Sequence, residues 1–189
     1  MADIRLLKKI IRDYLPYNER ERADREAMLR FCDDYNTVLT RENTLLHFTA
    51  SAWTRNPDSN KILMVYHNIY RAWSWIGGHA DGDADLKAVA ARELREETGV
   101  KTGRCLFNRP LSLEILAVQA HKKHGCYVAP HLHLNLTYLF EVEEDCPLIV
   151  KEDENAGVAW RSFEEIEKDN TEPHMTEIYR KLLVKMQDR

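Results

Sequence analysis

The chain has 189 residues, a length typical of one domain that buries its own core without disulfides or structural metal. With 44% hydrophobic residues, 31% charged residues, 7 Gly and 6 Pro, its composition excludes the disordered and collagen-like classes. The net charge of −4 lacks the cationic excess on which non-specific nucleic-acid binding depends, so a polynucleotide partner is not expected.

Two further features bear on the compartment. No stretch approaches the roughly 18 apolar residues that a membrane span requires, and charges interrupt the N-terminal segment, so we expect neither a membrane-spanning nor a secreted protein. The four cysteines are far apart and form no CxxC pair, which indicates reduced thiols; they are Cys32, Cys105, Cys126 and Cys146. We therefore expect a cytoplasmic protein.

The first part of the chain predicts two helices. Apolar residues from Ile4 to Leu15 recur at steps of three and four before Pro16, and a second helix is predicted over residues 18–35 with Asn18 as its N-cap. We interpret residues 1–43 as a helical N-terminal extension. The apolar stripe of these helices has to be covered either by the rest of the chain or by a second subunit, so the sequence leaves a homodimer open.

From about residue 44 onward, predicted strands are interrupted by a few helices. Gly99 ends a helix predicted over 86–98, and a short strand around residues 73–76 enters Gly77 and Gly78. The other strands are predicted over 46–53, 62–66, 111–122, 131–143 and 157–160, and the last two helices near 163–168 and 173–187. We expect a mixed α/β layered domain over residues 44–189.

The segment from Gly77 to Val100 carries the most specific chemistry. On a helix of ~3.6 residues per turn, Glu93 lies one turn from Glu96 and Glu97, so three carboxylates gather on one side. Such carboxylates repel one another and the helix macrodipole near its C-terminus, and a hard divalent cation relieves that repulsion. Oxygen ligands favour Mg²⁺, with Mn²⁺ as the second option, and Mg²⁺ commonly binds substrate phosphates too. The pattern indicates metal-dependent diphosphate chemistry, whereas the three glutamates alone would be typical of a solvated helix face.

This segment resembles the Nudix box, G-x5-E-x7-R-E-U-x-E-E-x-G-U, in which U is an aliphatic residue. Eight of the nine defined positions match: Gly78, Arg92, Glu93, Leu94, Glu96, Glu97, Gly99 and Val100. The ninth position differs, because Ala84 stands where the first glutamate of the box belongs.

The resemblance implies a Nudix hydrolase, with a mixed β-sheet between helices in an α/β/α sandwich. It implies Mg²⁺-dependent hydrolysis of a diphosphate linkage in a nucleoside diphosphate joined to another moiety X. Carried over by position, Glu93, Glu96 and Glu97 would be metal ligands or the general base, the carbonyl of Gly77 a further metal ligand, and Arg92 an orienting residue.

In many members of the family a further acid from a late loop completes the metal site. Three acids stand just before the strand predicted over 157–160, namely Glu152, Asp153 and Glu154. We choose Glu154 from these three as the additional metal ligand.

The departure at Ala84 has two consequences. In the family the missing glutamate is usually an ionic partner that supports the catalytic helix, so its loss should weaken activity without abolishing it. Asp81, Asp83 or Asp85 could supply the charge, or these acids could form only a turn with Asp85 as the helix N-cap. Ala84 also motivates an alternative function, a Nudix-like sensor module that binds a nucleotide without cleaving it.

Histidines form the second concentration of chemistry-bearing residues. His121, His124, His131 and His133 lie near Cys126, so a zinc site is one interpretation. His131 and His133 also share one face of a predicted strand, where they would contact phosphate or base if that face lines the active cleft, or would be ordinary polar positions if it does not.

Trp75 offers an aromatic ring close to the box. It could stack on a nucleobase or serve the core. We take His131, His133 and Trp75 as the candidate substrate-binding residues of a small-molecule nucleotide or diphosphate substrate, whose identity the sequence does not specify.

Overall fold

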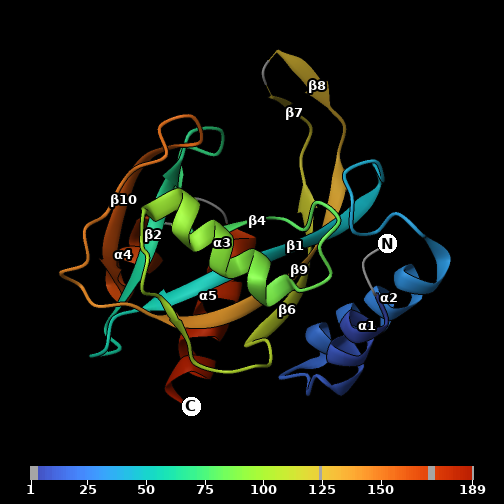
Figure 1. Ribbon diagram of the computed structural model, residues 1–189, viewed down its shortest axis with the longest axis horizontal. Coiled ribbons are helices and arrows are strands. Elements are labelled where there is room, and N and C mark those ends of the chain that lie inside the picture. Colours follow the sequence, from blue (N-terminus) through green and yellow to red (C-terminus); the bar gives the residue numbers. More distant parts are fainter. Residues whose placement is uncertain (1–3, 124, 170–172, 189) are drawn as a thin grey trace.

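The computed structural model describes residues 4–123, 125–169 and 173–188. A mixed β-sheet of eight strands runs through the molecule, and helices cover both of its faces (Figure 1). At its centre, β1 (Leu46–Arg55) and β9 (His131–Glu141) pair in parallel along their whole length. This arrangement confirms the predicted mixed α/β layered fold.

The remaining strands extend the sheet on both sides of β1 and β9. The sheet order is β10-β2-β1-β9-β5, with β2 spanning Lys61–His67, β10 spanning Asn155–Ser162 and β5 spanning Arg104–Cys105. Three further strands extend the same sheet by pairing with members of this series: β3 (Ala72–Ser74) with β2, β4 (Ile76–His79) with β1, and β6 (Ser112–Val118) with β9. A separate hairpin of β7 (His121–Lys123) and β8 (Cys126–Val128) projects from the sheet (Figure 1).

Two strand predictions need correction. The single short strand expected around residues 73–76 is two strands, because the chain leaves β2 after Ser74 and pairs with β1 from Ile76 onward. The strand expected over 111–122 is also divided. β6 reaches Val118 opposite His131, the first residue of β9, and beyond this point the chain turns into β7.

The helices begin and end where local signals place them. They are α1 (Ile4–Asp13), α2 (Glu19–Asp34), α3 (Leu86–Thr98), α4 (Phe163–Asp169) and α5 (Pro173–Gln187). The Asn18 side chain accepts the Glu21 N–H, and that of Asp85 accepts the Ala88 N–H, which confirms both predicted N-caps. Gly99 ends α3 in the left-handed conformation at φ 74°, which glycine adopts without a Cβ penalty.

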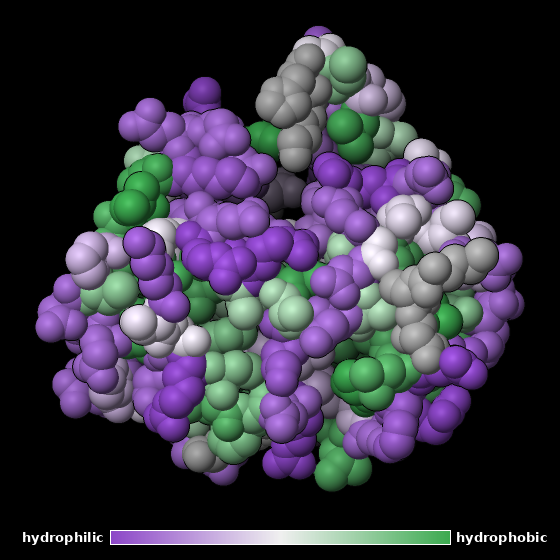
Figure 2. Space-filling model, viewed as in Figure 1, coloured by the Kyte–Doolittle hydropathy of each residue, from purple (hydrophilic) through white to green (hydrophobic). Residues whose placement is uncertain are grey.

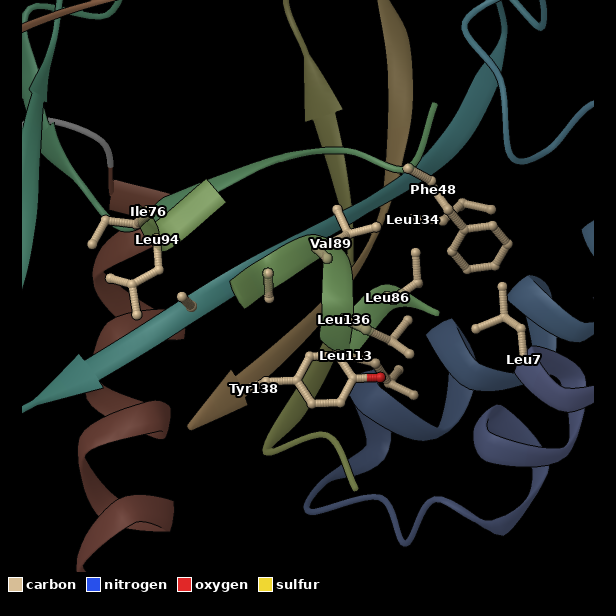
Figure 3. Close-up of a cluster of buried hydrophobic side chains, with 14 of the residues drawn as sticks. Leu7, Phe48, Ile76, Leu86, Val89, Leu94, Leu113, Leu134, Leu136 and Tyr138 are labelled. Atoms are coloured by element: carbon tan, nitrogen blue, oxygen red, sulfur yellow. The ribbon is translucent and has the colours of Figure 1, made fainter. Parts of the chain in front are cut away.

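Side chains alternate between the two faces of β1 and β9 and so separate two cores. On one face, Phe48 and Leu136 pack with the apolar side of α3, and Figure 3 shows Leu7 of α1 pointing into the same cluster. Leu7 and Ile11 have no exposed surface. The chain itself therefore covers the middle of the apolar stripe of α1, whereas Leu15 at the end of the stripe is exposed.

The second core lies on the opposite face of the sheet, under α5. Trp53 of β1 and Leu139 of β9 pack there with Tyr179 and Leu182, and the rings of Trp53 and Tyr179 stack 5.5 Å apart. Alternation therefore gives each long central strand two buried faces.

A buried ionic cluster joins the N-terminal helices to this second face. Glu21 of α2 has no exposed surface, and its carboxylate oxygens lie 2.8 Å from Nζ of Lys181 and 2.9 Å from Nζ of Lys185. It also accepts hydrogen bonds from the hydroxyls of Tyr14, at 2.6 Å, and Ser112, at 2.8 Å. The extension is thus fixed to α5 and β6 by polar contacts as well as by packing.

All four cysteines are free thiols, in line with the expected reduced state. Within the described part of the chain, no helix is both long and apolar enough to cross a membrane.

Candidate active site

Glu97 is the most constrained acid of the Nudix-like segment. It lies on the last turn of α3 with 4% of its surface exposed, and its Oε1 accepts the Gly77 N–H at 3.0 Å. Its Oε2 accepts the side-chain amide of Asn155 at 3.0 Å. Both carboxylate oxygens are therefore held, one by β4 and the other by the start of β10.

Glu93 lies one turn earlier and packs directly on β4. A Cβ at position 78 would lie 2.4 Å from Cδ of Glu93 and 2.6 Å from its Oε2, so only glycine leaves room for this carboxylate. Gly77 is equally confined, because its Cβ would lie 2.6 Å from the Ala50 carbonyl oxygen on β1. The two glycines thus let α3 approach β4 and β4 approach β1.

The electrostatics of these acids follow from burial and from one another. Burial above all raises the pKa of Glu97 to about 7; the hydrogen bonds from Asn155 and the Gly77 N–H act against this, and the charges of Glu93 and Glu154 add to it. Burial also raises the pKa of Glu93, with Arg92 acting against this and Glu96 adding to it. The site therefore concentrates negative charge in poorly solvated surroundings.

Glu96 and Glu154 lie at the edge of the same group. Glu96 is exposed on α3, and Glu154 precedes β10, where its Oε2 accepts a hydrogen bond from Lys151 Nζ at 2.9 Å. Glu154 is close enough to Glu93 and Glu97 to raise the pKa of both. The tertiary structure thus brings the chosen late-loop acid to the glutamates of α3.

Arg92 links α3 to β4 and to the loop before α3. Its Nη2 donates to the His79 carbonyl oxygen at 3.4 Å and lies 3.5 Å from Oε1 of Glu93. Its Nη1 lies 4.0 Å from Oδ2 of Asp83. The guanidinium of Arg92 therefore lies beside Glu93, and its orienting role stays a prediction.

The three aspartates around Ala84 have separate partners. Asp83 alone reaches Arg92, whereas Asp81 forms a two-bond ion pair with Arg41, at 2.8 and 3.0 Å, and Asp85 caps α3. Among the three acids weighed as substitutes for the missing glutamate, the geometry favours Asp83.

The residues present fit a magnesium ion. The carboxylates supply hard oxygen donors with an excess of negative charge, and Oδ1 of Asn155, beside Glu97, is buried without a hydrogen-bond partner. The carboxylates do not converge as tightly as a closed metal cage, since among the described residues the acids do not form a trio with ligand atoms within 4.8 Å of one another. Mg²⁺ usually keeps several waters and binds through few carboxylates, so the looser arrangement suits it.

The histidines are grouped differently from the sequence-based expectation. His131 and His133 lie with His47 of β1 and His79 of β4, and His121 is 6.4 Å from His131 between ring centroids. His124 lies outside the described residues, and Cys126 is exposed on β8. Sequence reasoning missed His47 and His79 because they are far from the others in the chain.

Trp75 lies on the α5 side of the sheet. Its backbone N–H donates to the Tyr179 hydroxyl at 3.3 Å, and the two rings meet edge to face at 5.7 Å. The ring is only partly buried, so part of it stays accessible. The substrate-contacting roles predicted for Trp75, His131 and His133 stay predictions. Asn155 was also missed, and only its place beside Glu97 identifies it.

Solved structures of similar fold include several hydrolases. A C. elegans Ap4A hydrolase in a binary complex aligns with a TM-score of 0.56 at 15% identity, covering 75% of this chain and 99% of that one. An E. coli dihydroneopterin triphosphate pyrophosphohydrolase gives 0.55 at 12% identity, covering 72% and 94%. The M. smegmatis Nudix hydrolase RenU gives 0.52 at 12% identity, covering 72% and 83%. At sequence identities this low, the alignments show that these proteins share a fold with this chain, and not that they share a substrate.

Curated proteins gave no match to the sequence. The NUDIX domain family, in contrast, matches residues 45–182, which is well over half of the chain and contains the whole segment from Gly77 to Val100. The protein therefore belongs to the NUDIX family.

Proposed function

We propose that the protein hydrolyses, with Mg²⁺, a diphosphate linkage in a nucleoside diphosphate joined to another moiety X. The observation that carries this proposal is the position of Glu97. A nearly fully buried carboxylate is held by Gly77 and Asn155, next to Glu93 and within electrostatic reach of Glu154. Burying a carboxylate among other carboxylates is costly, and sites of this kind cluster at catalytic centres.

Five groups would hold the metal: the carboxylates of Glu93, Glu96, Glu97 and Glu154 and the carbonyl of Gly77. When bound, Mg²⁺, or Mn²⁺ in its place, would neutralise phosphate charge and support the leaving oxygen. Arg92 lies 3.5 Å from Glu93 and would orient its carboxylate, and whichever of these carboxylates is not bound to the metal would accept the proton of the attacking water. Asn155 and the Gly77 N–H fix Glu97 so that it needs little rearrangement when substrate binds.

The substrate-contacting residues in this proposal are His131, His133 and Trp75. His131 and His133 lie on β9, which pairs with β1. β1 also pairs with β4, the strand that carries Gly77 and Gly78. Trp75 directly precedes β4. We also propose that the substrate is a small molecule and that the protein is cytoplasmic. The catalytic domain would begin at residue 44, after the helical extension of residues 1–43. A homodimer stays open.

The direct experiment is a substrate panel with purified protein and Mg²⁺. The panel contains nucleoside triphosphates, nucleotide sugars, ADP-ribose, capped ends, and the compounds for which the two fold neighbours are named, Ap4A and dihydroneopterin triphosphate. Reaction in ¹⁸O-water followed by mass spectrometry identifies which phosphorus is attacked. Glu97→Gln and EDTA are the loss-of-function arms, and Glu164→Gln, an exposed position on α4, is the matched control.

Cleavage that requires Mg²⁺, is lost in Glu97→Gln and is retained in Glu164→Gln would establish the reaction and the substrate class. No turnover across the panel, together with ligand-induced thermal stabilisation, would instead support the nucleotide-binding sensor that Ala84 suggests.

A further inference from the structure

Four histidines from three strands meet at one end of the central sheet. His47 of β1 pairs with His133 of β9 in the parallel register. His79 of β4 pairs with Thr49, which is two residues after His47 and therefore on the same face of β1. The ring centroids of His47, His79 and His133 are 5.0 to 5.1 Å apart in every pair. His131 completes the group, with its ring stacked on that of His47 at 5.0 Å.

Three of these imidazoles converge as metal ligands do. One ring nitrogen each from His47, His79 and His133 lies within 4.8 Å of the other two, and this is the one such trio of His, Cys, Asp or Glu in the described residues. Two imidazole nitrogens bound tetrahedrally to one Zn²⁺ at about 2.0–2.1 Å are about 3.4 Å apart. Binding of the ion would therefore draw the three nitrogens closer together.

One ring nitrogen of His47 is buried without a hydrogen-bond partner. Its Nδ1 lies 3.1 Å from the Asn43 carbonyl oxygen, which can only accept, so Nδ1 carries the proton and Nε2 the lone pair. That Nε2 is buried without a hydrogen-bond partner. A buried polar atom left unpaired costs free energy, and a carbonyl that fixes the other ring nitrogen is the usual support of a metal-binding histidine.

His131 is placed to support the trio. Its Nδ1 lies 2.9 Å from the Ala129 carbonyl oxygen and therefore donates, which leaves its Nε2 to accept a hydrogen bond from His133 Nε2 at 3.1 Å. In this arrangement the lone pair that the neutral His133 ring offers to a metal is on Nδ1. His131 thus orients the ring of His133, and we treat it as a positioning residue.

The hydrogen bonds of the rings favour a cation over an anion. His47 and His131 each direct Nδ1 at a carbonyl oxygen, so each neutral ring keeps its lone pair on Nε2. Neutral imidazoles offer lone pairs and lack the positive charge that would attract a phosphate. Nitrogen donors of this kind suit Zn²⁺ and related transition metals, whereas Mg²⁺ prefers oxygen.

We infer that His47, His79 and His133 bind one divalent transition-metal ion, with Zn²⁺ as the probe, at a site separate from the carboxylates of α3. The three ligands come from β1, β4 and β9, so the ion would tie together the strands that position Gly77 and Gly78. A fourth coordination position stays available for water or another ligand.

The test is metal binding by the apoprotein without substrate, which keeps it independent of the proposed hydrolysis. Zn²⁺ and Co²⁺ are titrated in excess Mg²⁺, which competes for the oxygen-ligand site, with calorimetry, the visible absorption of tetrahedral Co²⁺ and thermal melting as readouts. The variants are His47→Ala, His79→Ala and His131→Ala, with the exposed His174→Ala as control. His79 is partly exposed, so its variant keeps the test meaningful if loss of the buried His47 impairs folding.

We expect one Zn²⁺ per chain, a tetrahedral Co²⁺ spectrum and a rise in Tm of roughly 5 °C at saturating metal. His47→Ala and His79→Ala should abolish these effects, His131→Ala should weaken affinity about 10- to 100-fold, and His174→Ala should change nothing. Absence of binding by the wild type, or equal binding by the wild type and the His79→Ala variant, would overturn the inference. No metal binding combined with a raised KM for nucleotide in the His131 variant would overturn it too, and would favour direct substrate contact by this cluster.

Discussion

Gly78 and Glu93 share one space: a Cβ at residue 78 would lie 2.4 Å from Cδ of Glu93. Glu93, the first glutamate of α3, can therefore occupy its position only if residue 78 is glycine, even though 15 positions separate the two residues. β4 can lie this close to α3 only because residue 78 has no side chain.

Gly78→Ala should consequently impair catalysis more than folding. The obstructing atoms are the far end of a flexible side chain, so Glu93 can swing away at modest cost, but its carboxylate then leaves the site. We expect kcat to fall roughly 100-fold, as for a misplaced catalytic group, with a small change in Tm. Gly157→Ala is the control, because its Cβ would lie at an ordinary 3.6 Å from Trp73. Steady-state kinetics and thermal melting on both variants decide the matter, and an equal loss in the two would contradict the steric argument.

Glu97→Gln should retain the fold and lose activity. The new amide can accept only one of the two hydrogen bonds that Glu97 accepts, from Gly77 and Asn155. A flip of the Asn155 amide, whose Oδ1 is unpartnered, would restore the second contact. We expect kcat to fall by roughly 100-fold or more while the melting transition stays cooperative.

The double variant Glu97→Gln/Asn155→Ala separates the two effects. It should be less stable than Glu97→Gln alone without a further large loss of kcat. Wild-type turnover in Glu97→Gln would remove Glu97 from the proposed centre.

Asp83→Asn tests whether Asp83 takes the place of the missing glutamate at Ala84. Its carboxylate is 4.0 Å from Arg92, and both side chains are about a third or more exposed, so the pair is worth less than about 1 kcal/mol. We expect kcat to fall by roughly 2- to 5-fold, with little change in KM. Asp81→Asn, which breaks an ion pair with Arg41 instead, should leave kcat unchanged. Identical kinetics for the two variants would count against a special role for Asp83.

Glu21→Gln should destabilise the protein in a pH-dependent manner. Burial would raise the pKa of Glu21, but Lys181 above all, with hydrogen bonds from Lys181, Tyr14 and the Tyr17 N–H, lowers the pKa to about 2 from its ordinary 4.5. Charged groups facing Glu21 from neighbouring elements also include Lys185, Glu114 and Asp24. Because the pKa is lower in the folded state, the ionised carboxylate stabilises the fold above pH 4.5, and this contribution is lost as the pH falls toward 2.

Removing one partner from a buried ion pair typically costs about 3 kcal/mol, and we expect a loss of this size at pH 7. Denaturant unfolding of the wild type and the variant at pH 7, 4.5 and 3 should show a difference in unfolding free energy that shrinks at the acid end. A difference that is constant over this range would mean that Glu21 acts by packing alone.

Local signals determined much of this protein. Helix α3 forms where its apolar spacing, the Asp85 cap and Gly99 place it, and the eight matching positions of the box between Gly78 and Val100 indicated the family. Such features depend on neighbours a few residues apart, so the sequence itself displays them. The division of the strand around residues 73–76 was missed because it depends on which strand each half pairs with, and periodicity carries no information about the partner.

Only the tertiary structure decided the contacts across the sheet. Asn155 meets Glu97 across 58 positions, and His47 meets His133 because β1 and β9 pair in parallel. The sequence also left open what covers the N-terminal helices, and the packing of Leu7 and the ion pairs of Glu21 show that the same chain covers part of them. A parallel pairing is set by packing of the whole domain and not by local propensity, so the histidine cluster becomes visible only once the chain is folded.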